Sequence, residues 1–184
     1  MKRRFSSLRG IWVPTACGKF YLEASPRGLY RLEFAGKGKS LQWRVPRAAP
    51  YSELAEAQRL LIRYFRGEEV SFRNLKIDYS ACTNFEKKIL RCLSKLPRGR
   101  VVSYRGLAEK VGAPGAARAV GSVMKKNRLP IILPCHRVID SNGGLGGYSK
   151  GLAWKKRLLQ LEKILPKLTG PGPFCWKKCQ VSRG

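Results

Sequence analysis

The chain has 184 residues, 43% of them apolar, and a formal charge of +27 from 38 Lys and Arg against 11 Asp and Glu. That length allows one or two small domains with a buried core. A folded protein this basic is expected to bind a polyanion, with nucleic acid as the first candidate and an acidic membrane surface or a general bias toward Lys and Arg as alternatives.

Other features argue against an exported, membrane-spanning or zinc-binding protein. No apolar stretch reaches the roughly 18 residues of a membrane span, and the basic start of the chain has no apolar segment typical of a secretory signal. Six cysteines and a single histidine include no paired CxxC motif, so we expect no metal and no cofactor. We expect an intracellular, cytoplasmic protein whose cysteines are mostly free thiols, although Cys175 and Cys179 in "CWKKC" could form a disulfide.

The first part of the chain, residues 1–80, is predicted to be a small α/β domain. Short strands are expected at 11–15, 19–24 and 28–34, around a Pro-Arg-Gly turn. A helix is expected at about 52–66. Its apolar residues at helical spacing are Leu54, Ala57, Leu61, Tyr64 and Phe65.

The second part, residues 81–168, is more basic, because the segment from residue 83 onward carries a net +18. Its first helix should begin after Thr83, which forms a capping-box pattern with Glu86. The buried side of that helix is expected to hold Ile89, Leu90, Leu93 and Leu96.

A helix-turn-helix is predicted next. Ser103 can cap a short helix that runs to Lys110, a Gly-Ala-Pro-Gly stretch breaks it, and an Ala-rich helix is expected at about 115–126. The residues 141–151 should form a loop, a last helix should cover 152–165, and the tail 169–184 should be irregular.

The stretch "PCHRV" holds the only histidine, directly after Cys135. A thiolate at Cys135 would be a nucleophile, with His136 as its base and Arg137 adding positive field. Neighbours on an extended strand point to opposite faces, so the pair needs a turn or a bridging water. The alternative is a buried structural cysteine.

Glu162 interrupts an apolar helical stripe that contains Leu158 and Leu165. A buried carboxylate needs a partner, so Glu162 could orient His136, or it could lie at the edge of the stripe and pair with a lysine. Arg118, among small residues, could meet a DNA groove or lie on a solvated face. Tyr104 and Tyr148 could pack in the core or donate a hydroxyl proton in a pocket.

Several motifs together resemble those of the O6-alkylguanine-DNA alkyltransferases: "SYRGLA", "AARAVG", an Asn eight residues before the Cys, "PCHRV", "GGYSKGL" and the late Glu. The resemblance is strong from about residue 83 to 165 and loose before it. It implies a ribonuclease-H-like N-terminal α/β domain, then a mainly helical winged-helix, helix-turn-helix domain. The function implied is DNA repair by a single-turnover, irreversible transfer of the alkyl group from O6-alkylguanine, and possibly from O4-alkylthymine, to Cys135.

The same resemblance implies a role for each matching residue. His136 would act on Cys135 through a water, with Glu162 behind it, and Tyr104 would donate a hydrogen bond to the departing guanine. Asn127 would link the DNA-binding helix to the active-site turn. Arg118 would enter the base stack as the target base flips out through the minor groove. Other positions implied in DNA contact are Arg105, Ala117, Gly121, Lys126 and Ser141, and those in the guanine pocket are Val138, Tyr148 and Ser149.

The expected partner is double-stranded DNA containing O6-alkylguanine, bound by a monomer. Lys150 departs from the family, which often has Gly there. Three other functions remain as alternatives: lesion recognition without repair, for which the acceptor Cys is absent in known cases; a repair protein that also regulates genes, which needs an extra zinc domain; and a Cys-His hydrolase, which adjacent Cys and His do not favour.

Overall fold

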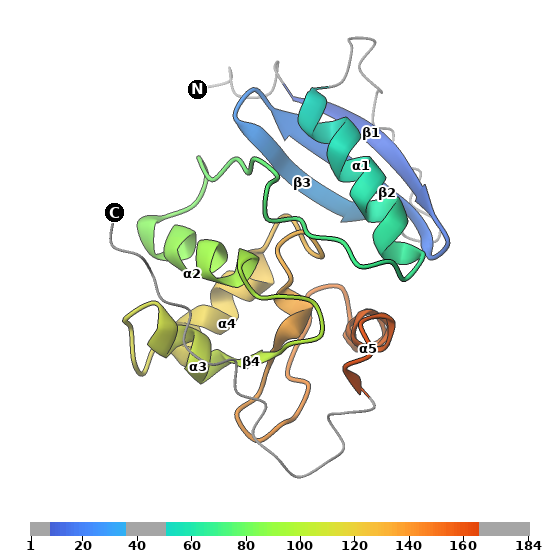
Figure 1. The fold of residues 1–184 in the computed structure, drawn as a ribbon. Helices are drawn as coiled ribbons and strands as arrows, with labels where there is room; N and C mark the ends of the chain where they lie inside the picture. Colours follow the sequence, from blue (N-terminus) through green and yellow to red (C-terminus); the bar gives the residue numbers. More distant parts are fainter. Residues whose placement is uncertain (1–7, 36–50, 166–184) are drawn as a thin grey trace. The chain divides into compact units, whose positions relative to one another are not determined.

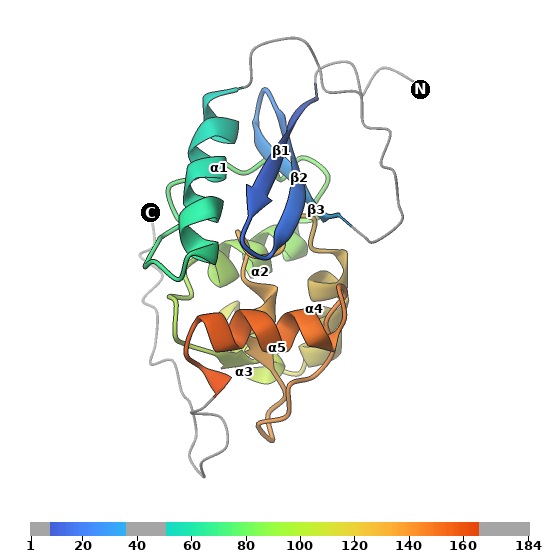
Figure 2. The same ribbon diagram turned by 90° about the vertical axis from the view of Figure 1, so that its right-hand side faces the viewer.

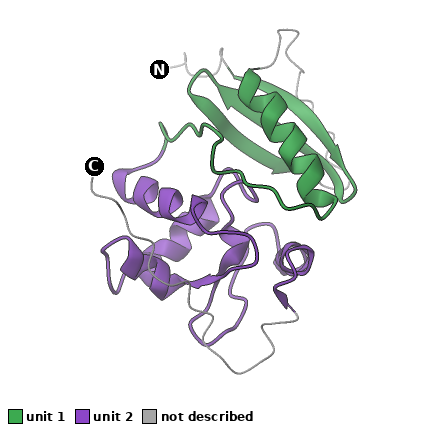
Figure 3. Cartoon of the chain, viewed as in Figure 1, with its two compact units in different colours: residues 1–81 green, residues 82–184 purple. Residues whose placement is uncertain are grey.

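The computed structural model describes residues 8–35 and 51–165, which fall into two compact units, 1–81 and 82–184 (Figure 3). The expected irregular tail, with Cys175 and Cys179, lies outside the described residues. The described part contains five α-helices and a three-stranded antiparallel sheet. The expected mixed α/β class is therefore confirmed.

The first unit is a meander of three strands with one helix against it (Figures 1 and 2). Strands β1 (Arg9–Thr15), β2 (Gly18–Ser25) and β3 (Gly28–Phe34) pair in sequence order, and α1 spans Ser52–Phe65. These elements match the predicted ones to within two residues. The apolar face of α1 is buried as expected, so period-two and helical patterns were sufficient to locate this unit's elements.

The tight approach of a later segment explains one glycine of this sheet. Gly28 has φ +131, and a Cβ there would lie 2.4 Å from the Lys76 carbonyl oxygen. The neighbouring Leu29 N–H donates to that same oxygen at 2.8 Å. Only glycine allows this backbone path beside β3.

The second unit begins with α2 (Asn84–Ser94), whose predicted capping box is confirmed. Glu86 N–H donates to the Thr83 hydroxyl at 3.2 Å, and Thr83 N–H donates to the Glu86 carboxylate at 2.8 Å. Ile89, Leu90 and Leu93 are buried along the helix. Leu96 is also buried, just beyond the helix end.

Two further helices form the predicted helix–turn–helix pair. Helix α3 (Tyr104–Lys110) begins where the Ser103 side chain accepts from Gly106 N–H at 2.9 Å, and it packs on α4 (Ala117–Lys126). Helix α4 starts two residues later than expected, because Gly115 has φ +85, in the left-handed region.

The last elements surround the Cys-His pair. Two short parallel strands, β4 (Val102–Ser103) and β5 (Val138–Ile139), pair beside a single turn of 3₁₀-helix, η1 (Cys135–Arg137). Helix α5 (Leu152–Leu161) follows the predicted loop. No helix within residues 8–35 and 51–165 is both long and apolar enough to cross a membrane.

One prediction about α5 is wrong. The helix was expected to continue to residue 165, but it ends at Leu161, and Glu162 is its C-terminal cap. Lys163 takes φ +58, and Ile164 N–H bonds back to the Leu159 carbonyl at 2.9 Å. This bond, together with the burial of Ile164, stops the helix in the manner of a Schellman turn.

Candidate active site

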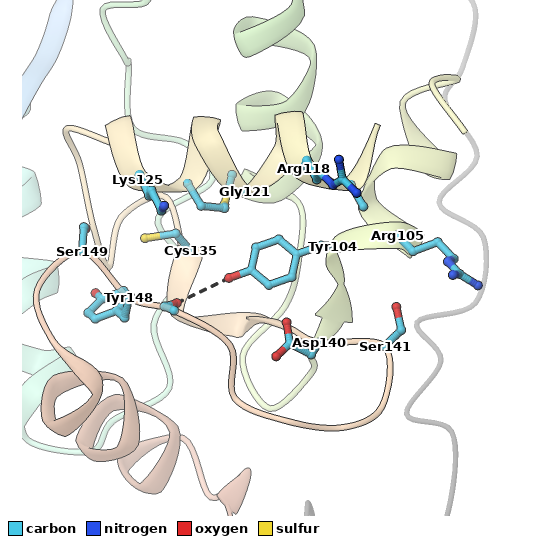
Figure 4. Close-up of a pocket in the computed structure, with 13 residues that line it drawn as sticks. Tyr104, Arg105, Arg118, Gly121, Lys125, Cys135, Asp140, Ser141, Tyr148 and Ser149 are labelled. Atoms are coloured by element: carbon cyan, nitrogen blue, oxygen red, sulfur yellow. Dashed lines mark hydrogen bonds between the residues drawn. The ribbon is translucent and has the colours of Figure 1, made fainter. Parts of the chain in front are cut away.

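A pocket of about 800 Å³ opens in the second unit, between α3, α4 and the loop before α5 (Figure 4). Most of the predicted site residues line it. Those that do are Tyr104, Arg105, Ala117, Arg118, Gly121, Cys135, Ser141, Tyr148 and Ser149. The pocket thus joins a buried thiol to an exposed basic helix within one unit.

Cys135 is held by an asparagine side chain from the end of α4. Asn127 Nδ2 donates to Cys135 Sγ at 3.1 Å and to the Leu133 carbonyl at 2.9 Å, while Asn127 Oδ1 accepts from Leu129 N–H at 3.0 Å. All of these groups are buried. Asn127 therefore connects α4 to the turn that carries the thiol, as predicted for its position.

The thiol of Cys135 is not ionised by its surroundings alone. Burial raises its pKa, while the hydrogen bond from Asn127 and the positive charge of Lys155 lower it. Since the thiolate and not the thiol is the nucleophile, this site needs a base nearby.

His136 is fully buried and bonded to Glu162. Its Nε2 lies 2.9 Å from Glu162 Oε1, while its Nδ1 has no hydrogen-bonding partner among the described residues. Burial lowers the pKa of His136 although the carboxylate opposes this. A neutral imidazole with one free nitrogen can accept a proton.

Glu162 also binds Arg137, and this corrects two expectations. Arg137 Nε donates to Glu162 Oε2 at 2.8 Å, and Arg137 Nη2 donates to Oε1 at 2.8 Å. Its third bond goes to the Leu96 carbonyl at 2.6 Å. The edge-of-stripe pairing with a lysine is therefore wrong, and Arg137 places its charge on Glu162 instead of on the thiol.

Two tyrosines line the pocket. The Tyr104 hydroxyl donates to the Gly147 carbonyl at 3.4 Å, and burial followed by Asp140 raises its pKa. The Tyr148 hydroxyl is buried, and its pKa is raised by burial and by the neighbouring Cys135. Both hydroxyls therefore stay protonated at neutral pH and can donate.

The helix α4 forms the outer rim. Arg118 is exposed, and Ala117 and Gly121 leave the helix surface low beside it. Lys126 does not line the pocket: its Nζ lies 3.6 Å from Glu86. Lys125 lines the pocket in its place.

Sequence comparison assigns the chain to a family. The family model described as "6-O-methylguanine DNA methyltransferase, DNA binding domain" matches residues 84–164. A protein of Methanosarcina barkeri named methylated-DNA–protein-cysteine methyltransferase is 38% identical over 155 residues, covering 82% of this chain and 94% of that protein. The chain belongs to the methylated-DNA–protein-cysteine methyltransferase family. The resemblance that the motifs indicated is confirmed.

Further members agree with this family assignment. A Mycobacterium leprae methyltransferase of the same name is 47% identical over 118 residues, covering 62% of this chain and 70% of that protein. The crystal structure of Mycobacterium tuberculosis O6-methylguanine methyltransferase has a TM-score of 0.70 at 32% identity, covering 85% of this chain and 93% of that one. The M. tuberculosis OGT in complex with DNA has a TM-score of 0.69 at 35% identity, covering 85% and 92%.

The sequence reasoning missed several residues at this methyltransferase site. Lys125 and Asp140 line the pocket, and no motif distinguished them from other surface charges. Lys155 could have been recognised from the sequence, because it interrupts the apolar stripe of α5 in the same way as Glu162 does. No three His, Cys, Asp or Glu side chains of the described residues lie together as a metal site requires.

Proposed function

We propose that the protein repairs DNA by moving the alkyl group of O6-alkylguanine onto Cys135, in a single irreversible turnover. One observation carries the proposal: a buried thiol lines a pocket beside an exposed basic helix, and the next residue, His136, is hydrogen-bonded to Glu162. Membership of the methyltransferase family supports the same reaction.

The chemistry starts with the thiol proton. A water between Cys135 Sγ and the free Nδ1 of His136 carries that proton to the imidazole, and Glu162 stabilises the imidazolium. The bridging water removes the difficulty that neighbouring side chains cannot bond directly.

The thiolate then attacks the alkyl carbon. The S–C bond forms as the C–O bond breaks, and the electron pair stays on the guanine, to which the Tyr104 hydroxyl donates a hydrogen bond. The proton that left the thiol for His136 balances the charge left on the guanine. The product is a thioether, whose C–S bond is not cleaved by hydrolysis at neutral pH. Each molecule therefore acts once.

DNA is the proposed partner, and α4 is the proposed contact. The small residues Ala117 and Gly121 let a minor groove approach the helix, and Arg118 enters the stack where the target base has flipped out. The backbone contacts proposed are Arg105, Lys126 and Ser141. The flipped base, O6-alkylguanine and also O4-alkylthymine, would lie against Tyr148 and Ser149. Val138, which was expected in this pocket, is fully buried outside its lining, and its carbonyl accepts from Lys155 instead.

The proposal also includes a specific fold for each of the two parts of the chain. Residues 1–80 form a ribonuclease-H-like domain that supports the fold, and residues 81–168 form a winged-helix type of helix-turn-helix domain that holds all the chemistry. The protein acts on double-stranded DNA as a monomer.

Intact-mass spectrometry tests this function. After incubation with a duplex containing O6-methylguanine, the protein should gain the mass of one methyl group in place of one hydrogen, on the peptide with Cys135, and stop at one per molecule. Tight binding to the same duplex with no gain in mass would assign the protein to lesion recognition without transfer.

A further inference from the structure

Lys155 is a fully buried cation for which the proposed reaction gives no role. It lies on α5 with 0% of its surface exposed, beside the buried Leu158 and Leu159. Burying an ammonium group costs several kcal/mol unless its protons are bonded and its charge is balanced. A residue kept at that cost needs an explanation.

All three protons of this ammonium are used, and every acceptor is a backbone carbonyl. Lys155 Nζ donates to Val138 at 2.6 Å, to Gly147 at 3.3 Å, and to Leu145. An ammonium has three donors and no acceptor. No carboxylate in residues 8–35 and 51–165 lies within ion-pairing distance of it.

The three carbonyls lie on two segments that line the pocket, one through Cys135 and the other through Gly147 and Tyr148, although Val138 and Leu145 do not line it themselves. Val138 lies on β5, directly after the turn that carries the thiol, whereas Leu145 and Gly147 lie in the loop that brings Tyr148 to the pocket. The Gly147 carbonyl also accepts from the Tyr104 hydroxyl (Figure 4). Lys155 therefore ties β5, the loop and, through Gly147, Tyr104 into one frame.

The charge of Lys155 acts on the thiol. It lowers the pKa of Cys135 against the effect of burial. Burial lowers the pKa of Lys155 itself to about 8, while Cys135 and Asp140 oppose that change. The other buried cation of the cluster, Arg137, is already neutralised by Glu162.

We propose that Lys155 is a positioning residue for alkyl transfer: it holds the two pocket walls together, and its charge stabilises the Cys135 thiolate. The inference rests on the proposed function. Near neutral pH, below its own pKa of about 8, Lys155 keeps its three protons, and each one is bonded to a carbonyl. When the sulfur takes the alkyl group, the ammonium loses the anion it stabilised but none of its hydrogen bonds.

Three variants test this role. Lys155→Met removes the charge and all three bonds, Lys155→Arg keeps the charge but changes the geometry, and Lys156→Met is the matched control at the exposed neighbouring position. The titration of Cys135 is followed by the ultraviolet absorbance of the thiolate, with Cys135→Ser as the blank. The rate of transfer from free O6-benzylguanine is measured over the same pH range.

Lys155→Met should raise the apparent pKa of Cys135 by about one unit and slow transfer at neutral pH by roughly tenfold or more. Part of this deficit should disappear above about pH 8, where the wild-type lysine also loses its charge and the thiolate forms without help. The rate deficit that remains at high pH should come from weaker substrate binding, because the pocket wall is displaced. The other titratable groups around the thiol and the lysine, namely His136, Tyr104, Tyr148, Asp140 and Glu162, are the same in every variant.

Lys155→Arg should keep the thiol pKa and weaken substrate binding, and Lys156→Met should match the wild type. An unchanged thiol pKa and rate in a folded Lys155→Met protein would overturn the inference. If that variant does not fold, a raised thiol pKa in Lys155→Arg would overturn the charge role. If the wild type transfers no alkyl group, the proposed function fails, and the thiol titration still decides whether Lys155 stabilises the thiolate.

Discussion

The two sides of Cys135 differ in nearly every physical respect. On the closed side, His136, Arg137 and Glu162 have side chains 0–7% exposed and bond to one another. On the open side, Arg105, Arg118, Ser141 and Ser149 are exposed at the pocket rim. In the proposed function, the charges of the closed side would control a proton, whereas those of the open side would contact a solvated polyanion. Substitutions on the two sides should therefore fail in different ways.

The largest effect is expected at the boundary itself. Cys135→Ser should abolish alkyl transfer, because a hydroxyl at this position is a far weaker nucleophile, and it should leave DNA binding intact. Mass spectrometry measures the first and a duplex-binding titration the second. Loss of both transfer and DNA binding would show that the thiol is structural. Cys135 would then not mark the boundary between a side for chemistry and a side for DNA binding.

Salt should act on the open side. Binding that neutralises six or more phosphates should fall roughly a thousandfold between about 50 and 200 mM salt. Transfer from free O6-benzylguanine, which involves no phosphate, should barely change over this range. A flat salt profile for duplex binding would mean that the +27 charge serves another purpose.

Glu162→Gln should damage the closed side in both stability and chemistry. Removing one partner of a buried charged cluster costs about 3–5 kcal/mol, and without the carboxylate His136 is a poorer base, so transfer should slow by roughly a hundredfold. Leu165→Gln, at a half-buried position just after α5, serves as the control for adding an amide close to the end of that helix. Thermal unfolding and single-turnover kinetics measure the two effects.

The free energy of unfolding at acidic pH provides a second test of the Glu162→Gln variant. Desolvation raises the pKa of Glu162, but His136 and Arg137 together hold it well below its usual value. Its ionisation therefore stabilises the fold above the unfolded value of about 4.3, and this stability is lost as the pH falls toward the folded pKa. Glu162→Gln should flatten the unfolding free energy in that range, whereas an unchanged slope would mean that Glu162 does not carry it.

The smallest effect is expected at Arg118. Arg118→Ala should slow repair of duplex DNA by roughly tenfold, equivalent to about 1.4 kcal/mol, and leave the reaction with free O6-benzylguanine unchanged. Lys88→Ala, an exposed cation on α2 outside the pocket lining, is the control. Equal losses of rate on both substrates would mean that Arg118 affects the transfer reaction itself and not the contact with DNA.

Much of the fold could be predicted because its signals are local. The capping box of α2, the cap at Ser103 and the strands of the first unit depend on residues within a few positions of one another. The end of α5 could not be predicted, because it depends on Ile164 being buried by distant residues and on a lysine adopting φ +58.

The site shows the same division. Glu162 was recognised because a carboxylate interrupts an apolar stripe, and Lys155 interrupts that stripe in the same way. The partner of Arg137 could not be predicted from neighbouring residues, since η1 brings both His136 and Arg137 to Glu162, which lies 25 positions after Arg137. Which cation lies near the thiol is decided by tertiary packing, 20 positions along the chain at Lys155.

The amide of Asn127 has a stereochemical consequence. It occupies one approach to the sulfur at 3.1 Å, and its other bonds fix it in place. In the proposed reaction, an incoming carbon would therefore have to reach the sulfur from the pocket side, with its leaving oxygen pointing away along the same line. The asparagine acts as a directional guide: it selects the angle of attack before any substrate has arrived.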